Sequence, residues 1–529
     1  MELLGTQFIG HTTTADGKDT FQAIDPSTGE KLLGDFHEAT QAEIEQACDL
    51  AEWAFRRYSR LTAVERAGLL EAIAEEIMAL GHTLIMRAEN ETRLPFPRLE
   101  GERARTVNQL KLLAEYIREG TWVDARIDRA IPDRTPLPKP DVRQVLRPLG
   151  PVAIFGASNF PLAFSVAGGD TASALASGCT VVVKGHPAHP GTSEMIAQAI
   201  LKAAEKTQMP EGVFSLVQGQ SHEVGTWLVK HPNIQAVGFT GSFKGGKALY
   251  DTANRREIPI PVFAEMGSTN PIFILPQALE QHHHHIAEGL ANSITLGVGQ
   301  FCTNPGMTFL SPGAHKDDFQ ISVKRSIEHT TAGTMLSSGI KNAYMEATDE
   351  LIKDPAIDLL GRGLQSAEPF SVPANIFWTG YQDFKQRKEW WHEIFGPCGM
   401  IINTESTEDL YDAASHLEGH LTATVHGTEQ DLAEFRDLFE ILERKVGRVV
   451  VNGYPTGVEV CHAMVHGGPY PATTAPQSTS VGTNAIKRFA RPVCYQDYPQ
   501  DLLPEALKDP NTLDILRMVD GIYTRNPIS

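Results

Sequence analysis

The sequence predicts an α/β protein built around a parallel β-sheet. Between residues 152 and 254, short apolar runs alternate with helical patterns at the spacing of βαβ units. A second α/β segment begins near Pro261 and continues to about residue 466. The chain has 529 residues. At roughly 150 residues per domain this is enough for three or four structural units, with a core that needs no disulfide or metal.

Three amphipathic helices are expected ahead of this alternation. Apolar residues recur every three or four positions over residues 38–57, 61–90 and 99–119. Residues 131–150 are rich in proline, which fixes φ and removes a backbone donor. That segment is therefore expected to be a connector or an edge hairpin.

Each strand and helix of the alternating region can be predicted from its sequence pattern. Strands are expected at residues 152–155, 180–183, 214–217 and 236–240, and helices at 165–177, 191–205, 222–230 and 244–254. A further strand is expected at residues 491–499. Parallel sheets of this kind bind ligands beyond the carboxyl ends of their strands, so a site is expected at that edge.

Composition excludes several classes of protein. Lys and Arg total 46 and Asp and Glu total 65, a net charge of −19, which disfavours binding to nucleic acid. The six cysteines are widely spaced and form no C-x-x-C pair, which indicates a reducing compartment. The first ten residues lack a basic start and an apolar core, and no membrane span is expected. The cytoplasm is the expected location.

Two histidine patterns raise the question of a metal. His282–His285 form an internal run, for which a solvated helix start is favoured over metal binding. His416 and His420 are four apart, as zinc ligands on a helix are, but a strand pattern begins at Leu421. No metal is therefore expected.

A glycine-rich segment follows the strand at 236–240. Residues 241–247 (GSFKGGK) nearly match a phosphate-binding loop, but Ala248 replaces the Ser or Thr that would hold Mg²⁺. This argues against an ATPase. Backbone N–H groups at such a helix start still suit a pyrophosphate, although no G-x-G-x-x-G fingerprint is present.

Three residues stand in settings that suit chemistry. Cys302 lies among small and turn-forming residues, where a thiolate can be populated. Glu265 and Glu393 each lie beside apolar and turn residues, where a carboxylate can act as a base. Taken singly, each has a plainer explanation: a buried packing cysteine and capping or surface glutamates.

Six ordered segments together resemble the aldehyde dehydrogenase superfamily, from about residue 20 to about residue 500. They are residues 157–161 (ASNFP), 181–184 (VVVK), 238–242 (GFTGS) with Gly246, 265–271 (EMGSTNP), 299–302 (GQFC) and 393–397 (EIFGP). The resemblance implies a Rossmann-like cofactor domain, an α/β catalytic domain and a small oligomerisation β-sheet.

The resemblance also implies catalytic roles. Cys302 would attack an aldehyde carbonyl to give a thiohemiacetal, and Asn159 would donate its side-chain N–H to the oxyanion. Hydride loss would leave a thioester, which water activated by Glu265 would hydrolyse. A non-catalytic relative of the family is disfavoured because all three residues are intact.

The same resemblance implies a dinucleotide site for NAD or NADP. The implied cofactor-binding residues are Lys184, Pro187, Gly241, Ser242, Gly246, Glu393 and Phe395. Many NAD-preferring relatives carry an acidic residue three positions after the lysine, where this chain has Pro187. Loss of that carboxylate removes repulsion against a 2′-phosphate. No arginine stands nearby to select NADP, and His222 is the nearest basic candidate, so the preference stays open.

A finer resemblance is to 2,5-dioxovalerate (α-ketoglutaric semialdehyde) dehydrogenases, which form 2-oxoglutarate. It rests on residues 156–170, 186–192 and 465–471. Long-chain fatty aldehyde dehydrogenases share this branch, so fatty or general aldehyde oxidation is the alternative. A semialdehyde carboxylate would need a cation, for which Arg103 and Arg105 are the candidates. Phe160, Phe164 and Phe301 are compatible with either substrate.

The expected division of the chain follows the resemblance. Residues 1–127 and 147–264 would form the NAD(P)-binding domain, 265–477 the catalytic domain, 128–146 and 478–503 the bridging strands, and 504–529 an unassigned C-terminal tail. An exposed edge strand invites pairing with another subunit, so a homodimer or homotetramer is expected. No nucleic-acid or membrane partner is expected.

Overall fold

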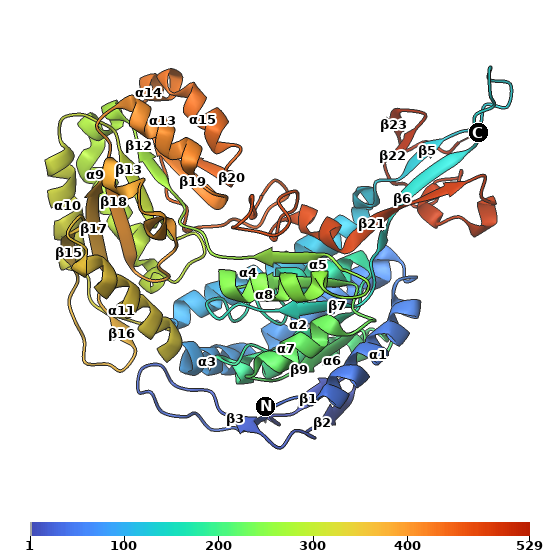
Figure 1. Ribbon diagram of the computed structural model, residues 1–529. Helices are drawn as coiled ribbons and strands as arrows, with labels where there is room; N and C mark the ends of the chain where they lie inside the picture. The colour runs from blue at the N-terminus through green and yellow to red at the C-terminus, as the bar shows by residue number, and fades with distance from the viewer. Residues whose placement is uncertain (1–2, 529) are drawn as a thin grey trace.

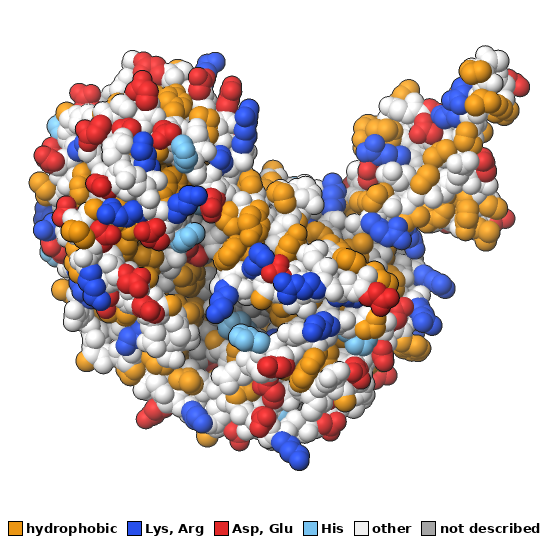
Figure 2. All heavy atoms as spheres, viewed as in Figure 1, with side chains coloured by type: hydrophobic (Ala, Val, Ile, Leu, Met, Phe, Trp, Pro, Cys, Tyr) orange, Lys and Arg blue, Asp and Glu red, His pale blue; other side chains and the backbone are white. Residues whose placement is uncertain are grey.

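The computed structural model describes residues 3–528 and contains three large β-sheets (Figure 1). Residues 1, 2 and 529, at the outer ends of two predicted segments, lie outside the described residues. Among the residues described, no helix is both long enough and apolar enough to cross a membrane. In Figure 2, acidic and basic side chains alternate over the visible face, and a hollow separates two projecting parts of the molecule.

The first sheet has seven strands in the order β11-β10-β7-β8-β9-β1-β2. Five of them are parallel: β7 (Val152–Phe155), β8 (Val181–Lys184), β9 (Phe214–Val217), β10 (Ala236–Thr240) and β11 (Val262–Glu265). The antiparallel strands β1 (Gln7–Ile9) and β2 (Thr12–Thr14) extend one edge. The connecting helices are α5 (Gly169–Ser177), α6 (Pro190–Lys206), α7 (His222–Lys230) and α8 (Phe243–Asn254).

Both faces of this sheet are covered because its strands are apolar on both sides. Val181 and Val183 pack into one hydrophobic cluster, whereas Val182 packs into another on the opposite face. The first cluster includes residues of α2, α4, α5 and α6, and the second includes residues of α1, α7 and α8. This explains why the strands appear in the sequence as continuous apolar runs.

The N-terminal helices are α1 (Gln41–Tyr58), α2 (Ala63–Ala79), α3 (Gly81–Thr92) and α4 (Phe96–Glu119). The single helix expected over residues 61–90 is wrong: the chain breaks between α2 and α3 at Gly81, whose φ is +59°. The helix expected from residue 165 likewise begins later, at Gly169, because turns occupy the preceding residues.

The second sheet has the order β15-β17-β18-β13-β12-β19-β20 and is parallel apart from the edge strand β15. Its strands are β12 (Ile272–Ile274), β13 (Met307–Leu310), β15 (Asp358–Arg362), β17 (Asn375–Gly380), β18 (Cys398–Asn403), β19 (His420–His426) and β20 (Val446–Val451). Its helices are α9 (Pro276–Thr295), α10 (Lys316–Glu328), α11 (Ser338–Lys353), α12 (Tyr381–Phe384), α13 (Thr407–His416), α14 (Glu429–Glu434) and α15 (Arg436–Leu442).

The third sheet projects from the body at the upper right of Figure 1. Its order is β21-β6-β5-β22-β23, with β5 (Arg126–Asp128), β6 (Val142–Pro148), β21 (Ala490–Gln496), β22 (Arg517–Val519) and β23 (Ile522–Thr524). The C-terminal segment from residue 504, which the sequence analysis left unassigned, thus supplies two strands of this sheet. Arg517 is fully buried and donates to the carbonyls of Ala506, Lys508, Asp509 and Asn526.

Small elements complete the chain. Two short antiparallel pairs are formed by β3 (Thr20–Phe21) with β4 (Phe36–His37) and by β14 (Gly333–Thr334) with β16 (Ser371–Val372). The 3₁₀ helices are η1 (Thr121–Val123), η2 (Leu296–Gly299), η3 (Lys388–Trp391), η4 (Thr483–Phe489), η5 (Gln500–Leu502) and η6 (Glu505–Leu507).

Candidate active site

Cys302 lies in the loop between η2 and β13, where the two large sheets meet. Gly299 in this loop has a φ of +62°, and a Cβ there would lie 2.2 Å from the carbonyl oxygen of Gly396. Only glycine permits so close an approach of two backbones. The loop of Cys302 is therefore held directly against the loop that carries Glu393.

Asn270 fixes the same loop from the other side. Its side-chain amide donates to the carbonyl oxygens of Cys302 and Asn304, at 2.9 Å each. Its oxygen accepts hydrogen bonds from the hydroxyls of Ser268 and Thr422. Because Asn270 and its partners Ser268, Asn304 and Thr422 are buried, Cys302 is held on a preorganised backbone.

Glu265, at the end of β11, faces Cys302 together with a histidine. His466 Nε2 lies 2.9 Å from Glu265 Oε1 and 3.4 Å from Cys302 Sγ. The hydroxyl of Ser480 donates to the other carboxylate oxygen at 2.5 Å. Since a carboxylate only accepts, we assign the proton of His466 to Nε2 when Glu265 is ionised.

The electrostatics of this group favour a carboxylate beside a thiol. Burial raises the pKa of Glu265, but the charge of His466 and hydrogen bonds from His466 and Ser480 reverse that effect and hold it below its usual range. Burial, with the charge of Glu265, raises the pKa of Cys302 well above its usual range. The thiol therefore keeps its proton until a base accepts it.

Asn159 lies in the turn after β7 and is buried. Its side-chain amide donates to the carbonyl oxygen of Gln300 at 2.9 Å, two residues before Cys302. An amide carries two N–H groups, so one donor remains for an anion formed near the thiol.

The start of α8 has the geometry of a phosphate site. Ser242 caps the helix by accepting from the backbone N–H of Gly245 at 3.2 Å. A Cβ at Gly241 would lie 2.7 Å from Phe239, and one at Gly246 would lie 2.6 Å from Met266. Phe239 and Met266 therefore pack directly against these two glycines, at a helix N-terminus, where anions are favoured.

Lys184 ends β8, beside Phe155 at the end of the neighbouring strand β7. Burial lowers the pKa of Lys184 to about 8, and the charge of Glu38 opposes that shift. Pro187 lies in the turn that follows, half-buried. His222, at the start of α7, is exposed.

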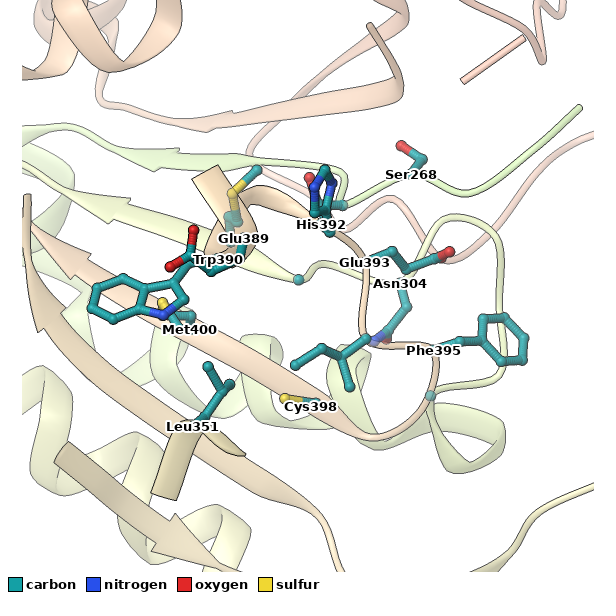
Figure 3. Close-up of a pocket in the computed structure, with 15 residues that line it drawn as sticks. Ser268, Asn304, Leu351, Glu389, Trp390, His392, Glu393, Phe395, Cys398 and Met400 are labelled. Atoms are coloured by element: carbon teal, nitrogen blue, oxygen red, sulfur yellow. The ribbon is translucent and has the colours of Figure 1, made fainter. Parts of the chain in front are cut away.

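Glu393 lies in a separate pocket, shown in Figure 3. The pocket is also lined by Ser268, Asn304, Trp390 and Phe395, with Trp390 and Phe395 at opposite ends of the view. Burial raises the pKa of Glu393 to about 8, which a hydrogen bond from the Ser268 backbone only partly offsets. A Cβ at Gly267 would lie 2.4 Å from the Glu393 carboxylate.

The three predicted phenylalanines form one cluster beside Cys302. The Phe160 ring centroid lies 5.3 Å from that of Phe164 and 5.5 Å from that of Phe301. Arg105 stacks on this cluster, with its Cζ 4.9 Å from the Phe164 centroid. Arg103 does not join it, because its guanidinium donates to the carbonyl of Gly81 instead.

The histidine run lies within α9, which begins six residues earlier at Pro276. His283 stacks on His315 with a centroid distance of 4.6 Å, close to Asp318. Among residues 3–528, the groupings with metal-ligand spacing are this one and Glu265–Cys302–His466. His416 and His420 belong to neither; they lie in α13 and β19.

Comparison with known proteins decides the family. The model of the "Aldehyde dehydrogenase family" matches residues 12–473 of this chain. The protein belongs to the aldehyde dehydrogenase family. This confirms the α/β fold and the class of enzyme predicted from the six sequence segments.

Two curated relatives of this aldehyde dehydrogenase match almost its whole length. "Alpha-ketoglutaric semialdehyde dehydrogenase 2" of Azospirillum brasilense is 50% identical over 98% of this chain and 99% of its own. "Alpha-ketoglutaric semialdehyde dehydrogenase" of Acinetobacter baylyi is 43% identical over 99% of each chain.

Among solved structures, betaine aldehyde dehydrogenase of Staphylococcus aureus in complex with NAD⁺ superposes with a TM-score of 0.79. The likeness covers 94% of this aldehyde dehydrogenase and 96% of that chain at 20% identity, so it establishes the fold alone.

Three residues of the site were not assigned a role from the sequence: His466, Ser480 and Arg98. His466 lies in the segment VHGGPYP, which served only to define the resemblance. The sequence did offer one indication: a single histidine among glycines and prolines predicts a loop, and loops often carry the polar side chains of functional sites. Ser480 and Arg98 carried no comparable signal.

Proposed function

We propose that this aldehyde dehydrogenase oxidises 2,5-dioxopentanoate (α-ketoglutaric semialdehyde) to 2-oxoglutarate with NAD or NADP as the acceptor. The observation that carries the substrate is the 50% identity, over nearly the whole chain, to a relative named for it. The chemistry rests on the arrangement of Cys302, Glu265 and Asn159 described above.

The first step is attack of the Cys302 sulfur on the aldehyde carbon. Glu265 accepts the thiol proton, and His466 holds the carboxylate in place through its Nε2–H, 2.9 Å away. The carbonyl oxygen becomes an oxyanion, to which the free N–H of Asn159 donates. One such donor is typically worth about 10²–10³ in rate.

The second and third steps release the acid. A bound nicotinamide would supply the hydride acceptor that converts the thiohemiacetal on Cys302 to a thioester. Glu265 releases the thiol proton to solvent, then removes a proton from water, and the resulting hydroxide adds to the thioester carbonyl. The C–S bond then breaks, so that the carboxylate departs and the sulfur regains its proton.

The chain's own residues fit a dinucleotide. The backbone N–H groups at the start of α8, which Ser242 caps, would bind a pyrophosphate. Lys184 and Pro187 would contact the adenosine ribose, and Glu393 and Phe395 the nicotinamide ribose. The choice between NAD and NADP is part of the test below.

We also propose the division of labour along the chain. Residues 1–127 and 147–264 form the cofactor domain, 265–477 the catalytic domain, and 128–146 with 478–503 the bridging strands. Strand β21 ends the projecting sheet and pairs on one side only, with β6. Its free edge is the surface through which a homodimer or homotetramer would assemble.

The test is reduced-nicotinamide absorbance with NAD or NADP crossed against 2,5-dioxopentanoate or a long-chain aldehyde. We expect the oxoacid to have the higher kcat/KM. Cys302→Ala should lower the rate by about 10⁴-fold or more, because the nucleophile is removed. A preference for the long-chain aldehyde would contradict the proposed substrate, and activity surviving in Cys302→Ala would contradict the mechanism.

A further inference from the structure

Helix α4 carries two arginines on the stripe that faces the nucleophile loop. Arg98 and Arg105 are seven residues apart, about two turns, so they project from the same side of the helix. Both guanidinium groups stack against the aromatic cluster of Phe160, Phe164 and Phe301.

Arg98 lies beside the residue that precedes the nucleophile. Its Cζ is 5.0 Å from the ring centroids of both Phe160 and Phe301. Nη2 donates to the carbonyl oxygen of Asn159 at 2.8 Å. Nη1 is buried and has no hydrogen-bond partner within residues 3–528.

Arg105 approaches the same site from about two turns further along α4. Its Cζ is 4.9 Å from the centroid of Phe164, whose ring lies 6.1 Å from that of His466. Nε and Nη2 are both buried, and neither finds a partner in the described part of the chain. The charge of Arg105 reaches Cys302 and opposes, without reversing, the rise in the pKa of its thiol that burial and Glu265 cause.

The carboxylates around the pair act on its charge but leave three of its guanidinium nitrogens without a hydrogen-bond partner among residues 3–528. Glu102 lies between the two arginines on α4 and acts on both, but one of its oxygens already accepts from the backbone of Leu162 and Ala163. Glu265 and Glu459 also act on Arg105. Buried N–H donors without partners are costly, so a ligand that supplies acceptors would be bound strongly.

We propose that Arg98 and Arg105 form a carboxylate-binding subsite that holds the far end of an oxoacid while Cys302 reacts with its aldehyde. The inference rests on the proposed function and names the residues that select its substrate. Across a five-carbon chain, the carboxylate lies about 5 Å from the aldehyde carbon when extended.

The same subsite would select against uncharged aldehydes. A hydrocarbon tail placed here would leave the buried guanidinium N–H groups unpaired, whereas a carboxylate would satisfy them. A site built for a polar group discriminates strongly against an analogue that lacks it. Arg103, buried on the same helix, serves as a control because its guanidinium bonds the carbonyl of Gly81 instead.

The first experiment compares kcat/KM for 2,5-dioxopentanoate with that for pentanal, an uncharged aldehyde of equal length. We expect Arg98→Met and Arg105→Met each to lower the ratio of the two values by about 10–100-fold, and Arg103→Met to leave the ratio unchanged. A ratio unaltered in both Arg98→Met and Arg105→Met, or altered equally in Arg103→Met, would overturn the subsite. Because the ratio is taken on one enzyme preparation, partial unfolding cancels.

The second experiment is independent of whether the oxoacid is the substrate. Glutarate is titrated as an inhibitor of pentanal oxidation. We expect competitive inhibition of the wild-type enzyme that weakens at least tenfold in Arg105→Met. Wild-type inhibition without a preference for the oxoacid would refute the proposed substrate yet support the subsite. Inhibition equal in the wild-type and Arg105→Met enzymes, or absent from both, would refute the subsite.

Discussion

Glu265 and Glu393 approach Cys302 from opposite sheets. Burial raises the pKa of a carboxyl group, so the more buried of the two should have the higher pKa, but the opposite holds. Glu265 is the more deeply buried, yet its pKa lies below the usual range. Glu393 is half-buried, and its pKa is raised to about 8. The difference lies in donors: His466 and Ser480 hold both oxygens of Glu265, whereas Glu393 has only a backbone contact at Ser268. Hydrogen bonding, rather than depth, sets the charge.

Replacing Glu265 tests the ionised member of the pair and has the largest expected effect. Glu265→Gln keeps the shape but removes the base, so kcat should fall by about 10²–10⁴-fold. Both deprotonation of the thiol and hydrolysis of the thioester lose their base, so stopped-flow absorbance should show a slowed burst of reduced nicotinamide, at most one per active site, followed by still slower turnover. Cys302→Ala, which forms no thioester, should show no burst. Full turnover in Glu265→Gln would disprove the role of this carboxylate.

Replacing His466 tests what keeps Glu265 ionised. The histidine lowers the pKa of Glu265, so His466→Asn should raise that pKa. Since the ionised form is the base, activity should then be lost at a higher pH: the acid limb of the kcat profile moves upward. We expect a fall of about tenfold at neutral pH that recovers in part as the pH rises. A uniform fall across the profile would indicate a purely structural role.

Removing the second donor should have a smaller effect. Ser480→Ala takes away the hydrogen bond to Glu265 Oε2 but leaves His466 in place. The acid limb of the kcat profile should move to higher pH, as for His466→Asn, but by a smaller amount. We expect kcat to fall by about 3–10-fold. Ser478→Ala is the matched control, because Ser478 bonds only the carbonyl of Ala475. A shift in that control equal to the shift in Ser480→Ala would contradict the prediction.

Replacing the neutral member of the pair should matter least near neutrality. With a pKa of about 8, Glu393 is mainly protonated at pH 7, and a glutamine resembles that form. Glu393→Gln should therefore change the dinucleotide Kd by less than about threefold at pH 7. Wild-type affinity should change as the pH passes 8, while that of Glu393→Gln stays flat, as measured by fluorescence titration. A tenfold loss of affinity at pH 7 would show that Glu393 binds as a carboxylate.

The fold was largely predictable because local sequence patterns determine most of its strands and helices. Apolar runs at β7, β8, β9 and β10 alternate with helices, and each strand appears where the sequence expects it. The break at Gly81 was missed because helical periodicity continues through it. The contribution of residues 517–524 to the third sheet was also missed, since their partner β5 is distant in the sequence.

The candidate site was predictable where short motifs carry it and unpredictable where packing does. Glu265 and Cys302 stand in distinctive turns. His466 and Ser480 reach Glu265 through a segment with little regular structure, anchored by the bridge between Glu265 and Thr473. The arginines of α4 could not be sorted from the sequence for the same reason. Around the helix axis, Arg103 lies about 140° from Arg98, whereas Arg105 lies close to the direction of Arg98. Which of them faces Cys302 depends on the packing of α4.

The projecting sheet has a consequence for the order of biosynthesis. Strands β5 and β6 leave the ribosome early, but their neighbours β21 and β22 come from the far end of the described chain. Until residues 517–524 emerge, β5 presents an unpaired edge, and the carbonyls of Ala506, Lys508 and Asp509 lack the guanidinium of Arg517. Completion of this sheet is therefore one of the last events of folding.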